Sequence, residues 1–228
     1  GRLVPHTTKR MRRRAVDPIR CAICAATAIE TVEQAQGYIP HLMHWVEMQD
    51  MHFRQKSFRL EVLNRADFLV REGGRRDPLG LTTSTRYLRN KRIDHTRLDS
   101  VAILQGLPLP LFVGVCIHEL GHVWLVQHNI VNLPMIDEEG FCELLAHRYY
   151  ASVAASVDRG EGEPLVSARV GEAGLRIDPQ AAHFYADNIA QNGNPIYGDG
   201  FRQLKQLEER LGFAQLTRSL LRKKKLPV

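Results

Sequence analysis

The first half of the chain carries the alternating pattern of β-strands. Phe58, Leu60 and Val62 occupy every second position, which predicts a half-buried strand. The segment 79–88 is rich in β-branched and aromatic residues and predicts a second strand, and the apolar run 100–105 predicts a third. We expect this third strand to lie at the edge of the sheet, where an extended peptide can pair with its backbone.

The second half of the chain changes to the helical period. Apolar residues there recur every three or four positions and predict five helices, over 109–127, 137–157, 179–191, 200–211 and a last piece ending at 221. An earlier helix is expected after the N-terminal cysteines, with Gly37 and Pro40 interrupting or kinking it. A small sheet followed by helices predicts an α+β fold with a helical C-terminal part.

Composition narrows the class of protein. The chain has 228 residues, of which 44% are hydrophobic and 25% charged, as expected for one soluble globular domain. Its longest apolar stretches, such as Leu109–Ile117, are shorter than the about 20 residues of a membrane span, so no membrane partner is expected. Four scattered cysteines do not predict a disulfide scaffold. Without a secretory signal pattern, we expect a cytoplasmic, intracellular protein.

The net charge of +6 is concentrated at the N-terminus. The first 14 residues hold six of the 31 Lys and Arg residues and none of the 25 acids, which leaves 25 bases against 25 acids in the rest of the chain. We expect residues 1–18 to form a flexible basic tail that binds nucleic acid only weakly. Nucleic-acid binding by the folded body is not expected.

His118, Glu119 and His122 form the HExxH pattern of zinc peptidases. Two histidines one helical turn apart lie on the same face and can bind one metal ion. Glu119 lies beside them, where it can take a proton from a water molecule as general base. The flanking residues are mostly apolar, so these polar side chains sit on a buried helix and need a partner. The pattern predicts one catalytic Zn²⁺.

His128 is the first of three candidates for the third metal ligand. It stands at the spacing of the metzincin pattern, which requires a glycine at which the chain turns, but Leu125 occupies that position. In a continuous helix His128 lies about 15 Å along the axis from His118, so it cannot bind the same ion. We therefore exclude His128 and with it the metzincin pattern.

The other two candidates are Glu138 and Glu139, at the start of the next predicted helix, where acids also serve as helix caps. Glu143 follows Glu139 by four residues and can accept a hydrogen bond from a metal-bound histidine. Glu138 has Cys142 at the equivalent position. We predict Glu139 as the ligand with Glu143 in the second shell of the site, and keep Glu138 as the alternative ligand.

A family resemblance supports this choice. The segment EEGFC is similar to the NEGFA stretch of gluzincin aminopeptidases, in which the glutamate before the glycine binds zinc; this implies Glu139. The block from 105 to 150, with IHELGHVWL and EEGFCELLAHRYY, resembles the peptidase domain of the DA1-like family, which contains LIM-domain, ubiquitin-activated zinc peptidases and bacterial relatives. The resemblance implies a gluzincin-like domain with an HExxH helix and a following glutamate helix.

The resemblance extends toward both ends of the chain. RCAICAATAIETVEQAQGYIPHL is similar to the junction at which a LIM zinc finger runs into the peptidase, and PIYGDGFRQL to a stretch near the family's C-terminus. We therefore expect a LIM remnant over 19–30, with Cys21 and Cys24 as a possible separate structural zinc site, and a peptidase domain over 31–228. The chain contains no recognisable ubiquitin-interacting helix, so dependence on ubiquitin is not carried over.

The expected reaction is hydrolysis of peptide bonds in protein or peptide substrates. Backbone pairing of the substrate favours an endopeptidase, and an aminopeptidase is the alternative that the sequence leaves open. Tyr197 is the candidate donor to the oxyanion, in a role that gluzincins assign to a later Tyr or His. Two alternatives remain: a non-catalytic zinc-stabilised interaction module, and a regulatory metallopeptidase that cleaves a repressor. Glu119 argues against the first, since a purely structural site has no use for a base.

Overall fold

The structure is a computed structural model that describes residues 21–72, 78–158 and 177–227. The predicted basic tail, residues 1–18, lies outside the described residues. The helices are α1 (Ala22–Ala26), α2 (Val32–Glu47), α3 (Arg65–Glu72), α4 (Leu109–Gln127), α5 (Met135–Asp158), α6 (Pro179–Ala190), α7 (Tyr197–Leu211) and α8 (Phe213–Lys223). The strands are β1 (Ala28–Ile29), β2 (Leu60–Leu63), β3 (Gly80–Arg89), β4 (Arg92–Leu104) and β5 (Leu107–Pro108). The predicted α+β class is confirmed.

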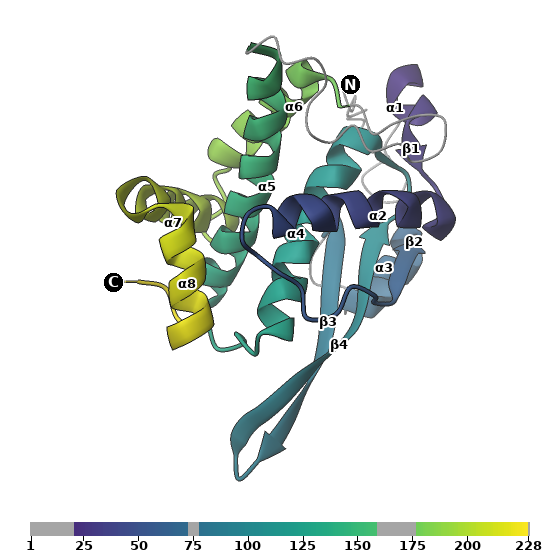
Figure 1. Cartoon of the computed structure of the whole chain (residues 1–228). Coiled ribbons are helices and arrows are strands. Elements are labelled where there is room, and N and C mark those ends of the chain that lie inside the picture. The colour runs from purple at the N-terminus through teal and green to yellow at the C-terminus, as the bar shows by residue number, and fades with distance from the viewer. Residues whose placement is uncertain (1–20, 73–77, 159–176, 228) are drawn as a thin grey trace.

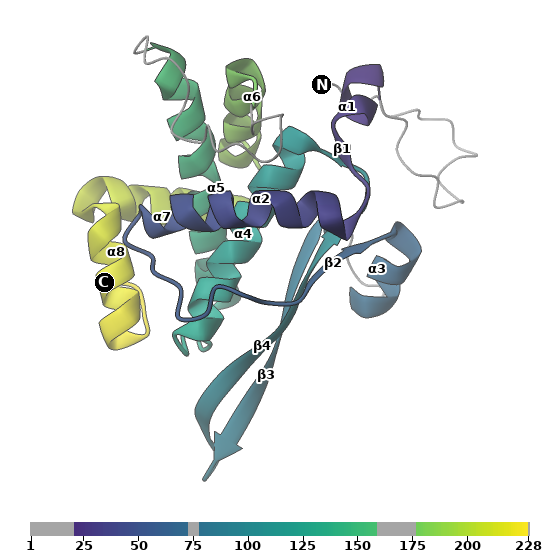
Figure 2. The ribbon, with the colours of Figure 1, turned by 45° about the vertical axis from the view of Figure 1, so that its right-hand side comes forward.

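The described strands form two small sheets. In the larger one β4 lies in the centre, parallel to β2 and antiparallel to β3, and in the smaller one β1 pairs antiparallel with β5. Strands β3 and β4 continue past the helices as a hairpin that projects from the body of the molecule (Figures 1 and 2). Asn90 and Lys91 form its turn with φ of 51° and 62°, the positive values that a tight hairpin turn favours.

Helix α4 lies at the centre of the fold. The sheet covers one side of it and the helices from α5 onward cover the other, while α2 crosses it (Figures 1 and 2). Phe112, Ile117, Val123 and Trp124 on α4 are fully buried, and burying a large apolar side chain stabilises the fold by about 1.5–3 kcal/mol. The HExxH pattern therefore lies on a helix that the core packs from several sides.

Two local predictions are wrong. Helix α2 runs unbroken through Gly37 and Pro40, because a capping box at Thr31 starts the helix and the buried Leu42 and Trp45 hold its second half against the core. Packing here outweighs the local cost of proline, about 3 kcal/mol. The strand over 100–104 is not at an edge, since it belongs to β4 in the centre of its sheet. The two edge strands of this sheet are β2 and β3.

The length argument against a membrane span also fails. Helix α4 has 19 residues and is long and apolar enough to cross a membrane. It is the one such helix among the described residues. However, 67% of its apolar 18-residue segment is buried inside the protein. The helix is therefore the core of this fold, and its length and composition are weak evidence for a membrane.

Candidate metal centre

Helices α4 and α5 bring three side chains together. His118 Nε2 lies 3.1 Å from Glu139 Oε2 and 3.2 Å from His122 Nε2. His122 Nε2 lies 3.4 Å from the same Glu139 oxygen. Two nitrogen atoms and one oxygen atom thus form a nearly equilateral triangle, with the histidines one turn apart on α4 and the carboxylate reaching them from α5.

This triangle has the size that a zinc ion requires. Zn–N and Zn–O bonds of about 2.0–2.1 Å in a tetrahedral site separate the ligand atoms by about 3.3–3.4 Å. The three observed separations lie within 0.3 Å of one another, between 3.1 and 3.4 Å. An ion in contact with all three atoms needs almost no rearrangement of the protein. The residues therefore fit a zinc site of two histidines and one glutamate.

Two further carboxylates of α5 contact the same histidines from behind. Glu138 Oε1 lies 3.1 Å from Nδ1 of His122, and Glu143 Oε1 lies 3.6 Å from Nδ1 of His118. Each imidazole therefore has its second nitrogen directed at an acid, an arrangement that fixes the ring orientation of metal-binding histidines. Glu138 and Glu143 thus contact the Nδ1 atoms of the histidines, whereas Glu139 faces their Nε2 atoms.

The buried charges change the acidity of these groups. Burial lowers the pKa of His118, but its hydrogen bond to Glu139 and the charge of Glu143 outweigh that effect and raise it. The pKa of His122 is raised further, although burial opposes this. Burial also acts to raise the pKa of Glu139, yet hydrogen bonds from the two histidines bring it well below its ordinary range. The charged forms of the histidines and of Glu139 therefore stabilise one another in this site.

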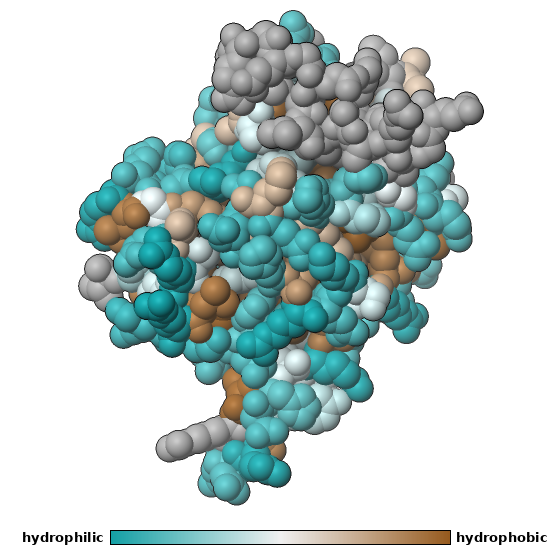
Figure 3. All heavy atoms as spheres, viewed as in Figure 1, coloured by the Kyte–Doolittle hydropathy of each residue, from teal (hydrophilic) through white to brown (hydrophobic). Residues whose placement is uncertain are grey.

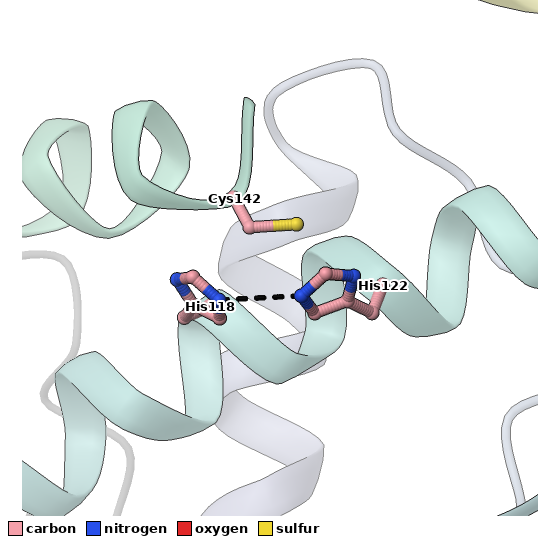
Figure 4. A group of neighbouring side chains, drawn as sticks. All are labelled: His118, His122 and Cys142. Carbon is pink, nitrogen blue, oxygen red and sulfur yellow. Dashed lines mark hydrogen bonds between the residues drawn. The ribbon is translucent and has the colours of Figure 1, made fainter. Parts of the chain in front are cut away.

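Cys142 lies close to the two histidines and points toward them from α5 (Figure 4). Its sulfur and one nitrogen of each ring lie within 4.8 Å of one another. Burial raises the pKa of this thiol to about 12, so it is protonated near neutral pH. Glu139 lies 3.1 and 3.4 Å from the two Nε2 atoms and has a lowered pKa, so its carboxylate fits a metal ligand better than the protonated thiol of Cys142 does. In the sequence, Cys142 stands out only as the residue four positions after Glu138.

Strand β3 holds Glu119 in place. Thr82 donates a hydrogen bond from Oγ1 to Glu119 Oε2 at 2.6 Å, and Glu119 is 5% exposed. A Cβ atom at Gly80 would lie 2.4 Å from Glu119 Oε1, so only glycine leaves room for the carboxylate there. The sequence contained no signal for the role of Thr82, because it precedes Glu119 by 37 residues and lies on a different element.

A cavity of about 1090 Å³ opens over these groups. Residues 78–82, at and just before the start of β3, form one wall, and α6 forms another with Phe184 and Tyr185. Phe184 is 52% exposed, so an aromatic surface is available to a ligand. The cavity is large enough for a segment of peptide chain, and His118, Glu119, His122 and Glu139 all line it.

Tyr197 lines the same cavity at the start of α7. Its ring centroid lies 6.3 Å from that of His118. Glycines set this position, because α5 and α7 touch through their backbones: a Cβ at Gly140 would lie 2.5 Å from the carbonyl oxygen of Gly200. Arg202 holds the preceding loop through the carbonyl oxygen of Asn192, at 2.9 Å.

Other predicted candidates lie apart from this centre. Helix α4 continues through Leu125 to Gln127 and His128 caps it, with its Nδ1 2.8 Å from the carbonyl oxygen of Trp124. His128 does not line the cavity. Cys21 caps α1, accepting from the backbone N–H of Cys24 at 3.4 Å. Within the described residues, neither cysteine belongs to a group of three side chains that could hold a metal ion.

Comparison with known proteins gives related plant sequences. "Protein DA1-related 1" of Arabidopsis thaliana is 32% identical over 122 residues, covering 50% of this chain and 22% of that protein. "Protein DA1" of the same plant is 30% identical over 112 residues, covering 46% and 20%. "LIM domain-containing protein HDR3" of Oryza sativa subsp. japonica is 25% identical over 234 residues, covering 86% and 47%.

These relatives are longer proteins, and the chain spans about a fifth of the length of the Arabidopsis relatives. No solved structure matches the chain. A family model described as "DA1-like: Protein DA1" matches residues 70–223, which include β3, β4 and every helix from α4 to α8. Because that match covers about two thirds of the sequence, the chain belongs to the DA1-like family.

Proposed function

We propose that the chain is a zinc-dependent peptidase with a gluzincin arrangement, in which His118, His122 and Glu139 bind one Zn²⁺. The observation that carries this proposal is the triangle of ligand atoms, with separations of 3.1, 3.2 and 3.4 Å. The cavity over the triangle supports a catalytic role, since a catalytic zinc site keeps one position open for water or substrate, whereas a structural site is closed.

Zinc, when bound, supplies a Lewis acid that polarises the scissile carbonyl and acidifies water. Glu119 is the general base: it takes a proton from the attacking water and delivers it to the leaving amine. Thr82 keeps the Glu119 carboxylate in one orientation through its hydrogen bond. Tyr197, from the opposite wall, is the proposed donor to the developing oxyanion. The exposed edge of β3 binds the substrate in extended form by backbone pairing.

The proposed peptidase domain comprises residues 31–228, and the substrate is a protein or peptide. The alternative of a non-catalytic zinc module is less favoured, because Glu119 contributes nothing to a purely structural site yet has a dedicated place beside Gly80 and Thr82. The second alternative, a metallopeptidase that cleaves a repressor, differs from this proposal only in its substrate. It would use the same metal site.

The test compares wild type with Glu119→Gln for zinc content and for cleavage of an unfolded protein substrate. We expect both proteins to bind one zinc ion per chain, while only the wild type cleaves, with loss of a general base reducing the rate by about 10²–10⁴-fold. A wild type that binds no zinc would overturn the metal site. Activity that survives in Glu119→Gln would overturn the role of the base.

A further inference from the structure

The β3–β4 hairpin carries its distal part far from the core. We call residues 84–97 the arm; it extends beyond the helices in both ribbon views (Figures 1 and 2). Leu88 near its tip is 67% exposed and Tyr87 is 37% exposed. The projection at the bottom of Figure 3 is largely hydrophilic, with small hydrophobic areas. Packing of the core does not require such an extension.

The arm is also a centre of positive charge. Its sequence contains five Lys and Arg residues and one acid, whereas the rest of the chain after residue 14 has 20 bases against 24 acids. Within the arm, Asp94 pairs with His95 at 3.0 Å, and Arg97 pairs at 2.9 Å with Asp99, which follows the arm on the same strand, β4. Arg86, Arg89 and Lys91 are exposed and form no ion pair with the described residues.

One strand joins this charge to the cavity. Residues 80–82 of β3 line the cavity beside Glu119, and the same strand reaches Arg89 after seven further residues, a span of about 23 Å. Strand β3 is an edge of its sheet, so its outer backbone groups can pair with an extended chain. A peptide that pairs with the edge at the cavity is thereby directed along the strand toward Arg86 and Arg89.

We propose that the arm is a docking site for an acidic segment of the protein substrate, outside the segment that is cleaved. This assignment rests on the proposed peptidase function and names the chemistry of its substrate: Asp- and Glu-rich sequence beside the scissile bond. The three unpaired cations attract the carboxylates, and Leu88 offers an apolar contact between them.

An acidic peptide fits this surface better than a single-stranded nucleic acid does. Nucleic acids bind such surfaces by stacking their bases on free aromatic rings. The ring of Tyr87 is already stacked on His95, with centroids 4.4 Å apart and planes 11° from parallel, and Arg97 lies 5.8 Å from its centroid. The free edge of β3 offers backbone hydrogen bonds, which suit a peptide.

Binding is tested with a fluorescein-labelled peptide of alternating Glu and Ser, in the Glu119→Gln background to prevent cleavage. The arm variant replaces Arg86, Arg89 and Lys91 by Gln. Its control replaces Arg210, Arg222 and Lys223 by Gln, exposed bases on α7 and α8 that give the same change in net charge. We expect the arm variant to bind at least about tenfold more weakly and the control to bind as before, with affinity falling as salt rises.

Cleavage is tested with one unfolded protein substrate, with and without an added acidic segment. The segment should lower KM for wild type but not for the arm variant, with kcat unchanged. Equal peptide binding by wild type and arm variant would overturn the docking site. Tighter binding of a single-stranded DNA of matched charge, lost in the arm variant, would overturn the assignment to an acidic peptide. Failure of zinc binding or cleavage would instead count against the peptidase function, because peptide binding to the arm is measured without either.

Discussion

Thr82 donates a hydrogen bond to the carboxylate of Glu119 across 2.6 Å, from an edge strand to the buried face of helix α4. The contact ties the proposed base to a wall of the cavity that we propose for the substrate. It joins two elements that no local pattern in the sequence connects.

We expect Thr82→Val to lower kcat without loss of zinc. The substitution keeps the shape of the side chain but leaves a buried carboxylate oxygen without its donor, and a hydrogen bond to a charged group contributes about 1.5–3 kcal/mol. This corresponds to about 10–100-fold in kcat. Thr82→Ser retains the hydroxyl and should recover most of the rate. The comparison needs steady-state kinetics and zinc content of the three proteins; equal kcat in wild type and Thr82→Val would remove Thr82 from the mechanism.

The ligand set is tested by four single substitutions. Glu139→Ala should weaken zinc binding on the order of 100-fold or more, since it removes one of three protein ligands. Glu138→Ala removes only a partner of His122 and should cost about 10-fold or somewhat more, while His128→Ala should have no effect. Titration against a fluorescent zinc chelator gives the affinities. Cys142→Ser should bind zinc nearly as wild type does, and a large loss there would place sulfur among the ligands instead.

Zinc affinity should rise with pH. The pKa values of His118 and His122 are raised above their ordinary value of 6.5, so near pH 7 the metal-free protein holds protons that zinc must displace. We expect proton release on binding, measured by calorimetry in buffers of different ionisation enthalpy. A binding enthalpy that does not depend on the buffer would contradict this prediction.

The two histidines and Glu139 also determine how the stability of the metal-free protein changes with pH. A raised histidine pKa stabilises the metal-free fold below about pH 6.5, and that contribution is lost as pH rises through the folded-state pKa. The lowered pKa of Glu139 stabilises it above the ordinary carboxyl pKa, and that contribution is lost as pH falls. The metal-free protein should therefore lose stability as pH rises above neutrality, and the gain in Tm on adding zinc should grow.

The backbone contact between α5 and α7 should resist substitution. A Cβ at Gly200 would lie 2.3 Å from the carbonyl oxygen of Ile136, and overpacking of this kind costs about 1–3 kcal/mol. Gly200→Ala should lower the free energy of unfolding by this amount in urea titrations and displace Tyr197. Gly193→Ala is the matched control, since a Cβ there meets no atom within 4 Å. If both variants lost the same free energy of unfolding, the backbone contact between α5 and α7 would not be the cause of the loss.

Local spacing in the sequence predicted most of the longer helices but missed α3, Arg65–Glu72. The helix over 109–127 was predicted with the bounds that the structure has, although its buried residues surround the helix instead of forming one apolar face. The pairing of 92–99 with β3 was missed, since Arg, Asp and His in that segment obscure the strand pattern. Its turn signal, Asn90 followed by Lys91, is weaker than the usual Asn-Gly.

In the candidate site, too, local spacing predicted some residues and tertiary packing decides the others. His118, Glu119 and His122 share one helix, so their proximity follows from helical geometry alone. The contact of Glu139 with both histidines depends on how α4 and α5 pack, and the sequence indicated it only through Glu143 and a family motif. Thr82 and Gly80 had no signal, because tertiary pairing of β3 with its sheet brings them to Glu119.

The burial of α4 has a consequence for how the chain is made. This 19-residue helix is complete before any residue of α5 leaves the ribosome, yet α5 is the element that covers its metal-binding face. A nascent chain that ends before Met135 therefore displays an apolar segment with the dimensions of a membrane span. Exposed segments of this kind promote aggregation and the binding of chaperones. A truncated product of this length should accumulate in the insoluble fraction, and its release to the soluble fraction should begin once α5 is included.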